Sequence, residues 1–351
     1  MRRLPVYFLI DVSESMVGEP IQQVEEGLGQ IIQALKTDPY AIETAWISII
    51  VFAGQAKTLV PLQEIINFYP PRFPIGGGTS LSRGLGHLMY ELRKNQVKTT
   101  YDMKGDWKPI IFLFTDGVPT DDTTAAITEW KQNWQRTANM VAVSFGNEAD
   151  TNVLKELTEN VVHFKNSSPA AYKQFFKWIT DSIKTSSESV EKNASGFELS
   201  KIHDTDTLSK IDLSKPLPPA SYTDSNFVVM VGKCQHMQRD YLMKYRRAEQ
   251  DAEIYGLNLN RLYYRLVGAF QVDKTYHELS DSNAKPASIN SEELIGNPTC
   301  PCCGNQWGFA LCSCGQIHCI GEEKLSTCPT CGNTAAYGAS EGGFDVNRAQ
   351  G

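Results

Sequence analysis

Apolar and polar positions alternate in blocks along the first half of the chain. The apolar, β-branched runs that predict buried strands are 6–10, 45–53, 109–115 and 139–146. The segments with helical periodicity lie at about 20–36, 80–95, 123–136 and 169–184. This alternation predicts an α/β fold whose mostly parallel sheet is covered on both faces. The run 57–62 follows the second strand closely enough to form a hairpin, so one edge strand is expected to be antiparallel.

The pattern changes after residue 186, where Ser, Lys, Asp and Pro predominate. Alternating patterns return at 227–234, 240–247 and 261–272 and predict strands. The expected organisation is an α/β domain, a linker, a small β-rich module, a cysteine-rich module and a disordered tail. The corresponding ranges are 1–186, 187–222, 223–295, 296–335 and 336–351.

Composition narrows the classes of function. The 351 residues are 41% hydrophobic and 21% charged, which is ordinary for a globular chain, and the formal net charge is −7. This balance argues against nucleic-acid binding, which needs an excess of Lys and Arg, and the basic cluster at 244–247 is expected on a solvated strand face. The sequence contains no run of eighteen apolar residues, so no membrane-spanning helix is expected. The short apolar run before residue 11, interrupted by Pro5, favours a first strand over a secretory signal and hence a cytoplasmic protein.

Oxygen-bearing side chains follow several of the predicted strands. Asp11, Ser13 and Ser15 leave the first strand, Thr79 follows a run of glycines, and Asp116 follows the strand at 109–115. Ligands of open parallel sheets bind beyond the carboxyl ends of the strands, so these five side chains are expected to meet there. Two carboxylates and three hydroxyls suit a hard divalent cation, Mg²⁺ or else Mn²⁺ or Ca²⁺, and leave a coordination position for a partner.

Eight of the nine cysteines lie between residues 300 and 331, and their C-x-x-C spacing favours a metal over disulfides. The expected ligands of one structural zinc ion, in a zinc-ribbon or RING-like module, are Cys300, Cys303, Cys328 and Cys331. Further candidate zinc ligands are Cys312, Cys314, Cys319 and His318, although Gln316 stands where a RING-like cross-brace would place a ligand, so the number of zinc ions stays open. Cys302 is interpreted as a spare thiol and Cys234 as a small buried hydrophobe.

Asp11-x-Ser13-x-Ser15, with Thr79 and Asp116 downstream, resembles the metal-ion-dependent adhesion site of von Willebrand factor A domains, over about residues 4–186. Together with the terminal cysteine pattern, it resembles the TerY family of bacterial tellurite-resistance and stress-response systems. The resemblance implies a Rossmann-like N-terminal fold, a C-terminal metal-binding domain and a non-enzymatic, metal-dependent protein-binding role. It also implies association with a protein kinase and a PP2C-type phosphatase, with this chain as the scaffold or the phosphorylated component.

An enzymatic alternative is a divalent-metal phosphohydrolase that uses Asp11 and Asp116. A haloacid-dehalogenase-type enzyme places a second Asp two residues after its nucleophile, where this chain has Ser13, and the general acid is therefore missing. The segment "GGGTS" has no P-loop lysine, and no G-x-S-x-G elbow is present. The sequence therefore favours a binding protein.

Overall fold

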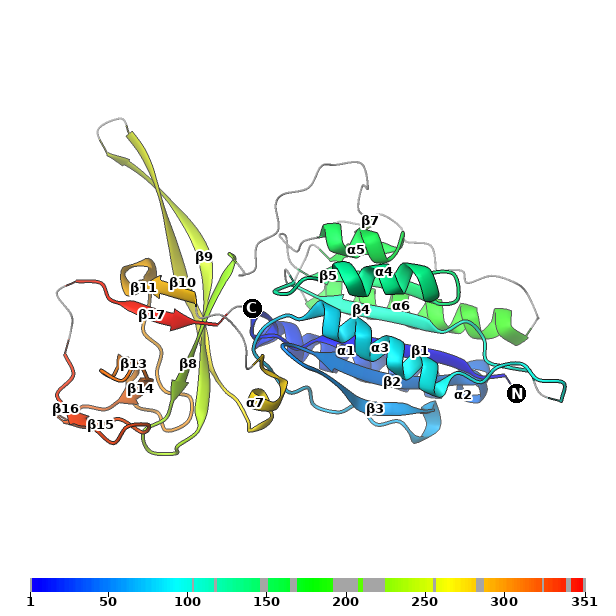
Figure 1. The fold of residues 1–351 in the computed structure, drawn as a ribbon, viewed down its shortest axis with the longest axis horizontal. Helices are drawn as coiled ribbons and strands as arrows, with labels where there is room; N and C mark the ends of the chain where they lie inside the picture. Colours follow the sequence, from blue (N-terminus) through cyan, green and yellow to red (C-terminus); the bar gives the residue numbers. More distant parts are fainter. Residues whose placement is uncertain are drawn as a thin grey trace.

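The chain forms two domains that lie end to end (Figure 1). The computed structural model describes residues 2–102, 104–116, 119–145, 151–164, 169–191, 208–210, 225–254, 257–281, 287–323, 325–338 and 342–349. We call the part up to residue 210 the N-terminal domain and the part from residue 225 the C-terminal domain. In the described part of the chain, no helix has the length and apolar character of a membrane span.

The N-terminal domain is built on a seven-stranded sheet with the order β3-β2-β1-β4-β5-β6-β7. Its strands are β1 (Leu4–Asp11), β2 (Ala45–Phe52), β3 (Ala56–Glu64), β4 (Ile110–Thr115), β5 (Asn139–Phe145), β6 (Val161–Phe164) and β7 (Leu208–Lys210). The strands β2, β1, β4, β5 and β6 are parallel to one another, while β3 pairs antiparallel with β2. The central strands are apolar on both faces because helices cover both, and β1 is buried along its whole length.

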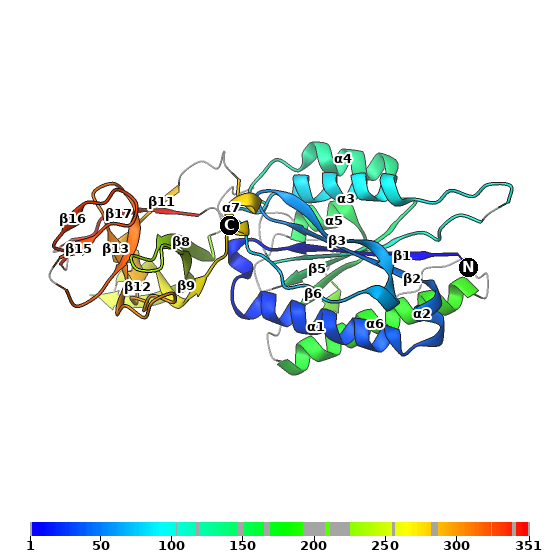
Figure 2. The same cartoon turned by 90° about the horizontal axis from the view of Figure 1, so that it is seen from below.

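Helices cover both faces of this sheet, as Figure 2 shows. The helical segments are η1 (Glu14–Met16), α1 (Glu19–Lys36), α2 (Pro39–Thr44), η2 (Ile65–Asn67), α3 (Leu81–Asn95), α4 (Thr124–Asn133), α5 (Thr151–Leu157) and α6 (Pro169–Glu191). One apolar core joins α1, α2 and α6 to the sheet, and a second joins α3, α4 and α5 to its other face. Alternate residues of β1 supply both cores, with Phe8 in the first and Tyr7 in the second. The expected three-layer α/β architecture is confirmed.

The far edge of the sheet differs from the sequence-based expectation. Residues 208–210, expected in a linker, form β7 and pair antiparallel with β6, so the sheet has an antiparallel strand at each edge rather than at one. Helix α6 also continues past residue 186 to Glu191. A strand of three residues is too short to leave a periodic pattern, which is why the sequence did not reveal it. The remainder of the expected linker lies outside the described residues.

The C-terminal domain is built on a six-stranded sheet with the order β12-β10-β9-β8-β14-β13. Its elements are β8 (Phe227–Lys233), β9 (Asp240–Ile254), β10 (Leu257–Gln271), α7 (Thr275–Leu279), β11 (Ala287–Asn290), η3 (Ser291–Glu293), β12 (Leu294–Ile295), β13 (Trp307–Leu311), β14 (Ile317–Ile320), β15 (Ser326–Thr327), β16 (Thr334–Ala335) and β17 (Asp345–Arg348). Because β14 pairs in parallel with β8, the expected β-rich and cysteine-rich modules share one sheet and form one domain.

The end of the chain also departs from expectation. Residues 336–351 were expected to be disordered, yet β17 pairs antiparallel with β11. Val346 is buried in the core of the C-terminal domain, and the Ala349 N–H donates to the Val229 carbonyl. One buried valine and backbone pairing hold this strand, and neither is visible as a hydrophobic pattern in a glycine-rich segment.

Candidate metal centres

The five oxygen-bearing residues lie at the carboxyl edge of the N-terminal sheet. Strand β1 is flanked by β2 on one side and β4 on the other, so the strand order reverses at β1. Such a reversal leaves a crevice beyond the strand ends, because the following connections leave in opposite directions. Asp11 ends β1, and Asp116 directly follows β4. The fold therefore brings both carboxylates to the crevice.

Asp11 is fully buried, and neighbouring groups fix its carboxylate. Its Oδ1 accepts a hydrogen bond of 2.9 Å from the backbone N–H of Ser13. Its Oδ2 accepts one of 2.7 Å from the Thr115 hydroxyl on β4. These bonds hold the Asp11 carboxylate in a fixed orientation, from which it could act on a cation directly or through a water molecule.

The two serines connect this loop to Asp116. The Ser15 hydroxyl donates to Asp116 Oδ1 over 2.8 Å, and the Ser13 and Ser15 hydroxyl oxygens are 2.9 Å apart. Because the single proton of Ser15 is directed at Asp116, Ser13 is the donor in the second bond. Both serines are at most 1% exposed, whereas Asp116 is partly exposed. These bonds bring oxygen atoms from the loop after β1 and the loop after β4 next to one another.

Thr79 supplies the clearest sign that the site takes a ligand. Its side chain is 1% exposed, and among the described residues its Oγ1 has no hydrogen-bond partner. A buried hydroxyl without a partner is costly, so it indicates a group that is satisfied by something besides the protein. A hard cation beside Asp11, Ser13, Ser15 and Asp116 would satisfy it, and these donors fit such an ion.

Two residues that sequence reasoning missed hold the Thr79 loop in place. The Thr120 hydroxyl accepts from the Thr79 N–H over 3.0 Å. Asp121 Oδ2 accepts from the Ser80 hydroxyl over 2.5 Å and also from the Ser82 hydroxyl. Both lie in "TDGVPTDD" directly after Asp116, and their acidic and hydroxyl character was the only signal available.

The cysteines form two groups, each with sulfurs within 4.8 Å of one another, and the grouping differs from expectation. The inner quartet is Cys234, Cys300, Cys303 and Cys319; the outer quartet is Cys312, Cys314, Cys328 and Cys331. The knuckle Cys300/Cys303 therefore does not share a site with Cys328/Cys331, and the expected joint zinc site is wrong. Spacing shows which two cysteines form a knuckle, but the fold decides which knuckles meet.

The distances between sulfurs fit a metal and not disulfides. Sulfurs of Cys303 and Cys319 are 3.7 Å apart, as are those of Cys312 and Cys331, and those of Cys314 and Cys328 are 3.8 Å apart. A disulfide needs about 2.05 Å. Four thiolates at about 2.3 Å from a tetrahedral zinc ion are about 3.8 Å from one another. Both quartets therefore have the size of a zinc-tetrathiolate shell.

The inner quartet includes Cys234, which was interpreted as a buried hydrophobe. Its N–H donates to the Arg239 carbonyl and its carbonyl accepts from the Gln238 N–H, as Cys300 does with Asn305 and Gly304. Gln238 has φ +53°, and Gly304 at the same place has φ +79°. Cys234 thus begins a metal-binding turn in which Met237 replaces the second cysteine, and this removed the C-x-x-C signal.

The thiols of the outer quartet differ in how readily they ionise. The backbone N–H of Cys314 lowers the pKa of the Cys312 thiol to about 6, whereas the pKa of the Cys314 thiol, which lies among the other three sulfurs, is raised to about 12. Cys302 belongs to neither quartet, and burial raises its pKa to about 12. His318 is buried, and its Nδ1 lies 3.1 Å from the Cys319 carbonyl, but it joins neither quartet.

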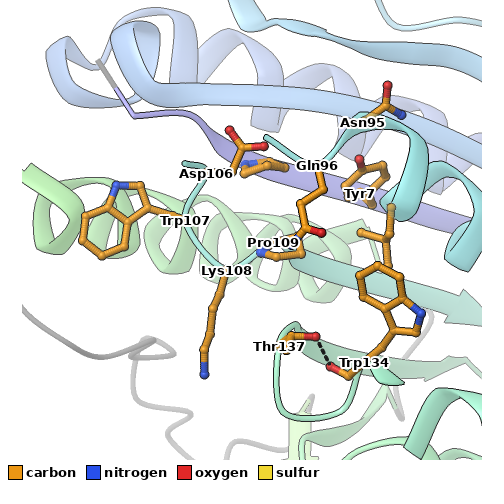
Figure 3. Close-up of a pocket in the computed structure, with 11 residues that line it drawn as sticks. Tyr7, Asn95, Gln96, Asp106, Trp107, Lys108, Pro109, Trp134 and Thr137 are labelled. Carbon is orange, nitrogen blue, oxygen red and sulfur yellow. Dashed lines mark hydrogen bonds between the residues drawn. The ribbon is translucent and has the colours of Figure 1, made fainter. Parts of the chain in front are cut away.

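A separate cavity of about 210 Å³ opens at the opposite end of β1 (Figure 3). It is lined by Tyr7, Trp107 and Trp134 among others, and the Asp106 carboxylate at its edge is held by Arg3 at 2.7 Å. Figure 3 shows Lys108 extending away from the aromatic side chains. Because the Asp106 carboxylate already pairs with Arg3, the residues that line this cavity do not favour a cation.

Comparison with protein families agrees with both centres. Residues 6–178 match the von Willebrand factor type A domain, and residues 224–351 match the TerY-C metal binding domain. The chain therefore combines the two domains expected of the TerY family. The C-terminal domain, with its two cysteine quartets, is thus the TerY-C domain, and the oxygen site lies in the von Willebrand factor type A domain.

Curated relatives match only part of the chain. Inter-alpha-trypsin inhibitor heavy chain H1 of Bos taurus is 26% identical over 163 residues, which are 44% of this chain and 17% of that protein. The Sus scrofa protein of the same name is 28% identical over 126 residues, 34% of this chain and 13% of that protein. The chain therefore spans less than a fifth of the length of these relatives.

Solved structures with similar folds include a von Willebrand factor type A protein from Catenulispora acidiphila, with 15% identity and a TM-score of 0.40 over 52% of this chain and 43% of that chain. Proximal thread matrix protein 1 from the mussel byssus, with a zinc-occupied MIDAS motif, has 17% identity and a TM-score of 0.38. The alignment covers 53% of this chain and 46% of that one.

Proposed function

We propose that this protein is a non-enzymatic scaffold of a bacterial tellurite-resistance and stress-response system, which binds a protein partner through a divalent cation at the oxygen site. The match to the TerY-C metal binding domain supports this setting, and we propose a cytoplasmic location. We further propose a protein kinase and a PP2C-type phosphatase as its partners.

The buried hydroxyl of Thr79 carries the proposal. Thr79 lies in a loop that is tied to the loop of Ser13 and Ser15, because the neighbouring Gly78 N–H donates to the Glu14 carboxylate. Mg²⁺ prefers six oxygen ligands and commonly keeps several positions for waters or a substrate group. When bound, the ion would supply a Lewis-acidic position for one more oxygen. The chain's own side chains fix that position, and an Asp or Glu carboxylate of the partner is the simplest donor.

The cysteine quartets support a different role for the second metal. Each has a complete set of thiolate ligands from this chain, which is typical of structural zinc. We therefore assign two zinc ions to the TerY-C domain and no catalytic role to either. A catalytic zinc site keeps one coordination position for water or substrate, and four thiolates leave none.

The decisive experiment is capture of partners from a native lysate by the tagged full-length protein, in Mg²⁺ and in a chelator that spares the cysteine sites. We expect the captured partner to be lost without Mg²⁺ and with Asp116→Asn. Asp122→Asn is the matched control, because Asp122 is an exposed carboxylate in the same loop. Equal capture by the Asp116→Asn protein, or in chelator, would place the interface elsewhere.

The enzymatic alternative is tested on the same protein. Metal-dependent turnover of a generic phosphate ester that disappears with Asp11→Asn would replace the binding role by a phosphohydrolase. We expect no such turnover, because Ser13 stands where the general acid of that reaction would be.

A further inference from the structure

A lysine of the C-terminal domain enters the metal-binding loop of the N-terminal domain. Lys244 lies on β9 within the basic cluster that was expected on a solvated face, yet it is 1% exposed. Its ammonium donates to the Val17 carbonyl over 3.1 Å and to the Ser15 carbonyl. It also lies 4.5 Å from the centre of the Phe227 ring. Ser15 is one of the five oxygen-bearing residues of the cation site, so Lys244 contacts the backbone of a candidate ligand.

A tyrosine of the same domain reaches both metal-site loops. The Tyr276 hydroxyl on α7 donates to Glu14 Oε1, and Glu14 lies between Ser13 and Ser15. The other oxygen of Glu14 accepts from the Gly78 N–H over 3.1 Å, next to Thr79. Tyr276 is 5% exposed and Glu14 is 1% exposed. A single buried carboxylate thus joins α7 to the two loops that carry the serines and the threonine.

Backbone contacts extend this junction along residues 279–281. The Gly77 N–H donates to the Ser280 hydroxyl over 2.8 Å, and the Asp281 N–H donates to the Gly77 carbonyl over 3.2 Å. A Cβ atom on Gly54 would lie 2.1 Å from the Asp281 nitrogen, so the two backbones approach closely there. Beside these loops, residues of both domains line a cleft of about 380 Å³, including Glu14, Gly78 and Tyr276.

The apolar part of the junction lies beneath the same loop. Val17 is buried with Val229, Leu242 and Tyr276 of the C-terminal domain. Gly18, at φ +92°, would place a Cβ atom 2.9 Å from the Phe270 ring. An L-residue here would be strained and would collide with β10. The loop between β1 and α1 is therefore shaped to the surface of the other domain.

Burying an ammonium is costly unless oxygen atoms satisfy it. Lys244 obtains those oxygens from the metal-binding loop, so its burial depends on contact between the domains and on the path of that loop. If cation binding moves the Ser15 backbone, it also moves the carbonyl oxygen that Lys244 binds. The same holds for Thr79, because Gly78 next to it is bonded to the Glu14 carboxylate that Tyr276 holds.

We propose that Lys244 and Tyr276 are positioning residues of the divalent-cation site, and that cation binding and docking of the TerY-C domain are coupled. The proposal rests on the proposed function, because it requires the oxygen site to bind a cation. Coupling of this kind is reciprocal: if docking organises the cation site, the cation must stabilise docking by the same factor.

The first test is hydrogen exchange of the zinc-loaded full-length protein with and without Mg²⁺. Residues 275–281 contain no residue of the oxygen site, yet we expect Mg²⁺ to slow their amide exchange. The effect should vanish in Asp116→Asn and in Lys244→Met. Lys274→Met is the matched control. Lys274 is exposed and directly precedes residues 275–281, and its loss changes the net charge by the same amount as the loss of Lys244.

The second test is the Mg²⁺ affinity of Tyr276→Phe by calorimetry. This variant removes one hydroxyl and no charge, whereas loss of Lys244 also removes a positive charge that opposes the cation. We expect the dissociation constant to rise about fivefold or more. Tyr264→Phe is the control, because that hydroxyl donates to the Ser225 carbonyl and touches neither loop.

The outcomes separate the two proposals. A wild-type protein that binds no divalent cation at the oxygen site overturns the proposed function and the coupling with it. If the wild-type protein binds Mg²⁺ and Tyr276→Phe binds it equally well, the coupling alone is overturned. Unchanged exchange at 275–281 does the same. Slowed exchange together with weakened binding in Tyr276→Phe supports it, even if Lys244→Met fails to fold.

Discussion

The oxygen site and the cysteine quartets differ in whether this chain supplies every ligand of the metal ion. Each quartet draws four thiolates from one domain, which fill the tetrahedral shell of zinc. The oxygen site draws two carboxylates and three hydroxyls from three segments, which leaves an octahedral ion with room for another donor. A metal whose ligands all come from one chain stabilises that chain. A metal with a position to fill can instead link it to a partner.

The quartets also differ from each other. The inner quartet joins the turn between β8 and β9 to β14, and three of its four cysteines are buried. The outer quartet joins the turn between β13 and β14 to the small hairpin of β15 and β16. Two of its cysteines, Cys314 and Cys331, are exposed. The inner ion is therefore expected to support the six-stranded sheet, and the outer ion mainly the hairpin.

The largest effect is expected from Cys234→Ser. Structural zinc contributes apparent free energies of about 10–16 kcal/mol in small zinc peptides, and this substitution removes one of the four inner thiolates. We expect loss of one zinc and of the cooperative fold of the C-terminal domain, measured by metal analysis and amide NMR spectra. Cys302→Ser, which removes the thiol outside both quartets, should keep two zinc ions. Two zinc ions in Cys234→Ser would contradict the inner quartet.

A smaller effect is expected from Cys331→Ser. The protein should retain one zinc and the six-stranded sheet, because the outer quartet ties down only the hairpin. In the wild type, a thiol-alkylating reagent should release zinc in two steps, with alkylation of Cys314 and Cys331 in the first. Alkylation of Cys319 before these two would reverse the assignment of inner and outer sites.

The sequence predicted the oxygen site because its signal is local. Asp11, Ser13 and Ser15 are within five positions of one another, and Asp116 directly follows a long buried strand. Parallel strands bring their carboxyl ends to one edge, so strand assignment was enough to predict that these residues meet. The same logic predicted the layers of the N-terminal domain.

The remaining features depend on long-range contacts that leave little local pattern. The turn at Cys234 has Met237 and Gln238 where the other knuckles have cysteine and glycine, so nothing marked it as a metal ligand. Strand β17 carries one buried valine in a glycine-rich tail. Lys244 belongs to a basic cluster, and only the neighbouring domain explains its burial. In each case the deciding partner lies far away in the sequence.

At the oxygen site, Asp11→Asn should separate binding from stability. The amide retains the shape of the carboxylate but removes one of the two negative charges of the oxygen site, so Mg²⁺ affinity should fall by about a hundredfold or about 2.7 kcal/mol. The zinc content should stay at two, and the melting temperature in chelator should not fall by more than a few degrees. Loss of folding in chelator would show that Asp11 is needed for the loop itself, through its bonds to Ser13 and Thr115.

The smallest and sharpest effect is expected from Thr79→Val. The hydroxyl of Thr79 is buried and, within the described residues, has no hydrogen-bond partner, so its replacement by a methyl group removes an unsatisfied polar atom at nearly constant volume. We expect the metal-free protein to unfold at the same denaturant concentration or higher, with a gain of about 1 kcal/mol, while the Mg²⁺ affinity falls about tenfold. Thr44→Val is the matched control: that hydroxyl is equally buried but donates to the Tyr40 carbonyl over 2.8 Å, so its loss should lower stability and leave Mg²⁺ binding unchanged. If Thr79→Val instead behaved as Thr44→Val does, the hydroxyl would be structural. The oxygen site would then lack the contrast with the cysteine quartets, because its threonine would stabilise the fold rather than bind the cation.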